Sequence, residues 1–117
     1  MAQYKYFKTE EFTCKETGEN RIQEDFIRAL DDLREACGFP FIINSGYRSP
    51  KHSAERNKAS GGGTHTKGIA ADIAVANGNQ RFVIVQKALE LGFSGIGVAK
   101  TFIHVDIRTE TPVIWSY

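Results

Sequence analysis

The chain has 117 residues, a formal net charge of +1 and a hydrophobic fraction of 41%. This length indicates a single domain, residues 1–117, with a modest hydrophobic core. The near-zero charge and the lack of a basic block exclude the usual electrostatic signature of a nucleic-acid partner, and no apolar run is long enough to span a bilayer.

The first twenty residues predict an arm of short extended pieces that is rich in aromatic side chains. This arm lacks the apolar core of a signal peptide, so we expect the chain to begin its life in a cytoplasm. Cys14 and Cys37 do not have CxxC spacing, and two cysteines do not build a disulfide framework. We therefore expect buried thiols without a zinc role.

A first helix is predicted from Asn20 onward, because apolar residues recur there at spacings of three and four as far as Cys37. Gly38 and Pro40 then end it. The β-branched segment FIINS, residues 41–45, predicts a short buried strand. A loop from Gly46 to about Gly68 follows, and loops longer than about 12–15 residues in compact domains are usually functional or disordered.

The second half of the chain predicts a strand, a helix and a hairpin. IAADIAV at 69–75 fits a strand, and the next helix begins at Gly78–Asn79 and ends at Gly92. GIGV at 95–98 and FIHVDI at 102–107 predict a hairpin, although its turn lacks the preferred glycine or asparagine. This order predicts an α+β fold, with a mainly antiparallel sheet and helices packed on one side.

Three side chains form the strongest candidate site, His65, Asp72 and His104. If the two strands that carry Asp72 and His104 lie side by side, these residues can meet, and His65 can complete a triangle from the loop. Two imidazoles and one carboxylate suit a catalytic zinc with a fourth position open to water. The alternative is that the aspartate is a turn or cap residue and each histidine a hydrogen-bonded group.

Three ordered segments strengthen the zinc interpretation: SGYRSPKH (45–52), GGGTHTKGIAADI (61–73) and FIHVDIR (102–108). They resemble the zinc D-Ala-D-Ala carboxypeptidase family of peptidoglycan peptidases, which shares its fold with the hedgehog signalling domain. The helix ahead of them and Trp115 also resemble the compact branch of this family, so the resemblance covers about residues 10–117.

The resemblance implies roles for individual residues. It implies that His65, Asp72 and His104 bind Zn²⁺, and that Arg48 holds a substrate carboxylate. A guanidinium suits that role because it can bind a carboxylate bidentately; the other interpretation of Arg48 is a surface salt bridge. His52 is a candidate substrate contact, with support of the site or ordering of the loop as alternatives.

The chain departs from these relatives at the general base. Many of them carry an acidic residue three positions before the final histidine, or a histidine two before it, where this chain has Thr101 and Phe102. Neither can act as a base. Asp106 shares the face of His104, about 7 Å along the strand, and is our candidate for the base. A supporting or strand-edge carboxylate is the alternative, and so is a register in which His104 is catalytic and Asp106 the third ligand. The weaker candidates for the base are Glu55 and Glu110.

These features predict a zinc metallopeptidase that hydrolyses peptidoglycan stem peptides next to a D-amino acid, of the D-Ala-D-Ala carboxypeptidase or L-Ala-D-Glu endopeptidase type. The compact size and the missing signal peptide predict a monomeric phage endolysin. Such a protein is held in the host cytoplasm before lysis and acts on the periplasmic cell wall. The alternative is a non-catalytic zinc-containing module that binds the cell wall or forms part of a phage structure.

Overall fold

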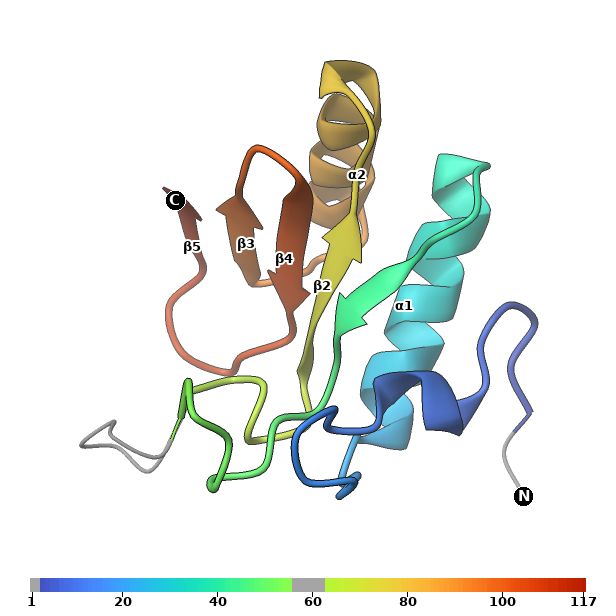
Figure 1. Cartoon of the computed structure of the whole chain (residues 1–117). Coiled ribbons are helices and arrows are strands. Elements are labelled where there is room, and N and C mark those ends of the chain that lie inside the picture. The colour runs from blue at the N-terminus through green and yellow to red at the C-terminus, as the bar shows by residue number, and fades with distance from the viewer. Residues whose placement is uncertain (1–2, 56–62) are drawn as a thin grey trace.

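A five-stranded sheet carries two helices on one of its faces in the computed structural model, which describes residues 3–55 and 63–117 (Figure 1). Neighbouring strands are antiparallel except for the last pair, β3 and β5, which is parallel. The predicted α+β fold, with a mainly antiparallel sheet and helices on one side, is confirmed. In spatial order the strands are β1 (Ile43–Ser45), β2 (Ala70–Ala74), β4 (Phe102–Asp106), β3 (Gly95–Val98) and β5 (Val113–Ser116).

Both predicted helices are present, although the first begins later than expected. Helix α1 spans Glu24–Cys37 and ends before Gly38. It does not begin near Asn20, because the backbone of Gln23 is extended and its N–H donates to the carbonyl of Gly68 at 2.9 Å. Helix α2 spans Gly78–Glu90 and is capped by Asn77, whose side chain accepts a hydrogen bond from the N–H of Gln80.

The hydrophobic core lies between the helices and one face of the sheet. Alternation along β2 and β4 divides each strand between this core and the opposite face. Burying each large apolar side chain stabilises the fold by about 1.5–3 kcal/mol. The helices contribute Phe26, Ile27, Leu30, Leu33, Ile84 and Ala88, and the central strands contribute Ala71, Ile73, Ile96, Ile103 and Val105. This division leaves the polar residues of β2 and β4 on the opposite face.

Two elements were not predicted from the sequence. The N-terminal arm contains a short 3-10 helix, Thr9–Phe12, and the chain after the hairpin returns to the sheet as β5. The hairpin itself joins β3 to β4 as predicted, with Gly97 opposite His104. Because β5 then pairs with β3, the segment around Trp115 lies on the sheet rather than in a tail.

In the described parts of the chain, 3–55 and 63–117, none of the helices has the length and apolar character needed to cross a membrane.

Candidate active site

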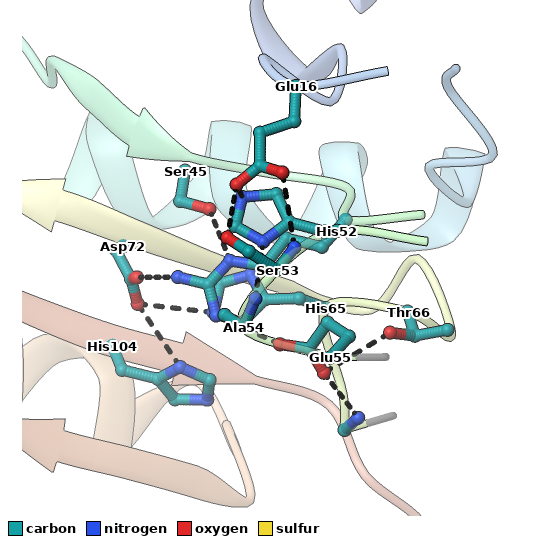
Figure 2. Close-up of polar contacts among 12 residues, drawn as sticks. Glu16, Ser45, His52, Ser53, Ala54, Glu55, His65, Thr66, Asp72 and His104 are labelled. Carbon is teal, nitrogen blue, oxygen red and sulfur yellow. Dashed lines mark hydrogen bonds and ion pairs between the residues drawn. The ribbon is translucent and has the colours of Figure 1, made fainter. Parts of the chain in front are cut away.

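The three predicted ligands meet on the face of the sheet that the helices leave open. The register of β2 with β4 places Asp72 directly opposite His104. His65 comes from the turn that precedes β2, and all three side chains are buried. The nitrogens His65 Nε2 and His104 Nδ1 lie 3.3 Å and 3.2 Å from Asp72 Oδ1 (Figure 2).

The hydrogen bonds behind the two rings fix which nitrogens face Asp72 without a proton. His65 Nδ1 lies 2.8 Å from the carbonyl of Gly46, which can only accept, so this nitrogen carries the hydrogen. His104 Nε2 lies 2.7 Å from a carboxylate oxygen of Asp106, which fixes the hydrogen there by the same argument. In the neutral rings, two nitrogen lone pairs therefore point at the carboxylate oxygen of Asp72.

Such an arrangement suits a cation between the three atoms. The ligand atoms all lie within 4.8 Å of one another. Tetrahedral zinc, with bonds of about 2.1 Å, holds its ligand atoms about 3.4 Å apart, close to the two distances to Asp72. The donor set thus fits zinc in both chemistry and spacing.

The hydrogen bonds of the cluster shift the pKa values of Asp72 and His104. Without a cation, a ring that carries a second proton donates to Asp72 instead. Burial alone would raise the pKa of Asp72, but such hydrogen bonds with His104 and His65 hold that pKa well below its usual value. Burial alone would lower the pKa of His104, whereas hydrogen bonds with Asp106 and Asp72 raise it. The carboxylate of Asp72 is therefore ionised at neutral pH, as a metal ligand must be.

Asp106 lies behind His104 rather than in front of it. Its side chain is fully buried, and its Oδ2 accepts from His104 Nε2 and from Arg108 Nη2, both at 2.7 Å. Its Oδ1 accepts from Arg108 Nε at 2.9 Å and from the Arg108 backbone N–H at 3.1 Å. Burial alone would raise the pKa of Asp106, but hydrogen bonds with His104 and Arg108 lower it.

This geometry disfavours Asp106 as the general base, because both carboxylate oxygens already accept hydrogen bonds. It favours the alternative weighed from the sequence, a carboxylate that orients a metal-binding histidine. It also disfavours Asp106 as a third ligand, since the atoms that converge belong to His65, Asp72 and His104.

Two glycines of β3 make room for this arrangement, and sequence reasoning missed them. A Cβ built on Gly95 would overlap the Asp106 carboxylate, and one built on Gly97 would lie 2.7 Å from the Trp115 ring. Both distances are too short for real Cβ contacts. The signal was the alternation Gly-Ile-Gly on the strand beside the ligand strand, which marks close approach by neighbouring side chains.

Arg48 is anchored in the site instead of forming an isolated surface pair. Its Nη2 lies 3.3 Å from Asp72 Oδ2, its Nη1 3.1 Å from Glu55 Oε2, and its Nε 3.0 Å from Ser45 Oγ. Glu55 is fully buried and also accepts from the Gly63 N–H at 2.8 Å. Glu55 therefore orders the loop around Arg48, a role that does not suit a general base.

His52 points away from the cluster of His65, Asp72 and His104 (Figure 2). Its Nδ1 accepts from the Ala54 N–H at 2.9 Å, and its Nε2 lies 3.1 Å from Glu16 Oε2. Ser53 donates to the same carboxylate through its backbone N–H and its hydroxyl (Figure 2). These contacts favour the loop-ordering alternative over a substrate contact.

A cavity of about 540 Å³ opens over the cluster. Glu110 lines it and pairs with Lys67 at 3.7 Å, whereas Asp106, Glu55 and His52 are not among its described lining residues. Besides the three candidate ligands, its lining comprises cationic residues (Arg48, Lys67, Arg108), aromatic residues (Phe102, Trp115, Tyr117) and Gly63, Thr64 and Glu110. The cationic part suits an anionic substrate.

Comparison with known families agrees with this site. The family model described as Peptidase M15 matches residues 5–106, and the chain belongs to this peptidase family. The resemblance predicted from the three sequence segments is thereby confirmed. Peptidases of this family depend in general on zinc, and the His-Asp-His cluster is a group that could bind it. No curated protein matches the chain.

Proposed function

We propose that the protein is a zinc peptidase that hydrolyses stem peptides of peptidoglycan next to a D-amino acid. The observation that carries the proposal is the convergence of His65 Nε2, Asp72 Oδ1 and His104 Nδ1 below a cavity that also contains Arg48. Membership of the peptidase M15 family supports the same reaction class.

Different residues of the site bind the metal and the substrate in this proposal. His65, Asp72 and His104 would hold zinc, which when bound supplies a Lewis acid and an acidified water. Arg48 retains N–H groups beyond those bonded to Ser45, Glu55 and Asp72, and these bind a substrate carboxylate. Glu110 is the described carboxylate, other than the candidate ligand Asp72, that lines the cavity, so it is placed to accept a proton there.

The experiment combines metal analysis with hydrolysis of purified peptidoglycan. The wild-type protein should bind about one zinc per chain and release new free amino groups, and a chelator should abolish the release. Asp72→Ala should lose both properties, whereas the matched variant Asp25→Ala removes an exposed carboxylate of α1 and should keep them. Absence of metal binding in the wild-type protein would refute the proposal.

Mass spectrometry of the released fragments assigns the bond. Loss of a terminal D-Ala indicates the carboxypeptidase type, and an internal cut before D-Glu the endopeptidase type. The endolysin role, with storage in the host cytoplasm before lysis, is part of the proposal. Expression with and without a membrane-permeabilising protein tests it, because lysis should require both.

A non-catalytic wall-binding module is the second candidate. It is favoured by Thr101 and Phe102, which occupy the positions where relatives carry a base, and by the buried Asp106. Such a module would sediment with peptidoglycan and release no amino groups while still containing zinc.

A further inference from the structure

Phe102, Trp115 and Tyr117 form an aromatic wall of the cavity. The C-terminal part of this wall and Arg48 approach the His65, Asp72 and His104 cluster from opposite edges of the sheet. Arg48 is bonded to Ser45 of β1, whereas Trp115 belongs to β5, and β1 and β5 are the two outer strands. The Trp115 ring lies 4.9 Å from the His104 ring, between centroids. A substrate in the cavity is therefore contacted by the guanidinium on one side and by aromatic rings on the other.

Tyr117 is the residue of this wall that carries a hydroxyl group. It follows β5, and its backbone N–H donates to the carbonyl of Val98 at 3.1 Å, which continues the pairing with β3. Its ring centroid lies 5.0 Å from that of Phe102 and 6.2 Å from that of Trp115. Although 69% of the residue is exposed, its backbone and both ring neighbours restrict its position.

The phenol of Tyr117 is protonated at the pH at which a peptidase works. Partial burial raises the pKa of this phenol above its usual value, and hydrogen bonding to the Trp115 side chain acts in the opposite direction. The charge of Asp72 also raises this pKa, and the charge of Arg48 lowers it. Because the indole N–H of Trp115 can only donate, the phenol keeps its own O–H as a donor.

The cationic side chains among the described residues that line the cavity already have carboxylate partners. Arg48 is bonded to Asp72 and Glu55, Arg108 to Asp106, and Lys67 pairs with Glu110. A phenolic hydroxyl brings a hydrogen-bond donor without adding a charge that would compete for these carboxylates.

We propose that Tyr117 is a catalytic residue whose phenolic O–H donates a hydrogen bond to the oxygen of the scissile carbonyl as that oxygen gains negative charge. The inference rests on the proposed peptidase function. When water oxygen bonds to the carbonyl carbon, the π electron pair moves to the carbonyl oxygen, and Tyr117 stabilises it without giving up its proton. When the C–N bond breaks, that pair re-forms the carbonyl, and the amine leaves with the proton lost by the attacking water. A donor aimed at charge that develops only in the transition state raises kcat more than it lowers KM.

The test compares Tyr117→Phe with the wild type and with Tyr4→Phe, which removes the same atom from a residue packed against the core. Three quantities are measured. They are kcat and KM for hydrolysis of a stem peptide isolated from peptidoglycan, and affinity for a phosphinate peptide, a tetrahedral anion that mimics the developing charge. Zinc content and melting temperature serve as checks on the metal site and the fold.

Tyr117→Phe should lower kcat about 10–100-fold, below the larger losses seen for fully enclosed oxyanion donors. The phosphinate should bind more weakly by a similar factor, while KM, zinc content and melting temperature stay unchanged, and Tyr4→Phe should match the wild type. Unchanged kcat and phosphinate affinity in Tyr117→Phe would overturn the inference. A raised KM with unchanged kcat would also overturn it, because Tyr117 would then contact the substrate equally before and during reaction. An inactive wild-type protein would refute the peptidase function and the inference together, whereas an active wild type with an unaffected Tyr117→Phe refutes the inference alone.

Discussion

Replacing Asp106 with asparagine should weaken zinc binding while leaving the fold intact. The carboxylate accepts the Nε2–H of His104 on one side and three N–H groups of Arg108 on the other. An asparagine has one acceptor oxygen, and we expect this oxygen to face the guanidinium. The amide NH₂ then faces His104 Nε2, which can accept only if the ring moves its hydrogen to Nδ1, the nitrogen that faces Asp72.

The expected loss of zinc affinity follows from the changed partner of His104 Nε2. Losing the outer partner of a metal-binding histidine typically costs about 10–100-fold in metal affinity, which corresponds to about 1.4–2.7 kcal/mol. The folded state should lose a further about 1–3 kcal/mol because charge-assisted bonds to Arg108 are weakened. The difference in stability should depend on pH. The depressed pKa of Asp106 stabilises the wild type above about pH 4, the usual carboxyl pKa, and this stabilisation is lost as pH falls below it.

The assay is competition for zinc against a chromogenic chelator at neutral pH, with Asp25→Asn as a matched exposed control. We expect a weaker zinc dissociation constant for Asp106→Asn and an unchanged one for the control. Hydrolysis at saturating zinc should largely recover in Asp106→Asn. If zinc affinity is unchanged and hydrolysis is lost even at saturating zinc, then Asp106 acts on the substrate, and the sequence-based assignment as general base is correct.

Three further outcomes follow from the structure. Gly95→Ala should lower zinc affinity about tenfold, measured by the same competition, because its Cβ would displace the Asp106 carboxylate; equal affinity would show that this carboxylate tolerates displacement. Glu55→Gln should raise KM for a peptide with a free carboxylate about tenfold without changing zinc content, because Arg48 loses a charged partner; an unchanged KM would contradict the anchoring role. Burial raises the pKa of the Cys37 thiol to about 11, so iodoacetamide should modify it at pH 8 about a hundredfold more slowly in the native than in the unfolded chain, and equal rates would contradict this.

Sequence periodicity was sufficient to place Asp72 and His104 of the candidate metal cluster, because alternation along a strand is local and regular. Asp72 and His104 each lie on a strand whose apolar residues define the buried face, so their shared face followed without knowledge of the register. His65 was harder, since it lies in a turn where alternation does not fix the direction of a side chain, and it entered the candidate site as a residue that could complete the triangle from the loop. Its position depends on contacts with Gly46, which is 19 residues away.

The role of Asp106 could not be derived in this way. A supporting carboxylate and a general base both require the face of His104, and they differ only in the orientation of the imidazole ring. That orientation depends on Arg108, which occupies the remaining lone pairs of Asp106, and on Trp115, which packs on the ring. Trp115 reaches the ring through β5, which is short, mostly exposed and paired with a strand that is not its neighbour in sequence. Its Val-Ile-Trp composition favours a strand, but four residues show no alternation that would reveal its partner or the face that Trp115 occupies.

The site combines residues of the sheet with residues of the segment between β1 and β2. His104 is held on a central strand by Asp106 and Trp115, whereas His65 and Arg48 come from the segment between β1 and β2. The two sets of residues meet at Asp72, whose Oδ1 faces both histidines while its Oδ2 faces Arg48. A substrate carboxylate that draws Arg48 toward itself therefore removes positive charge from Oδ2 and leaves more negative charge on Asp72 for the cation. Substrate binding and metal binding should consequently favour each other, because the same carboxylate serves both.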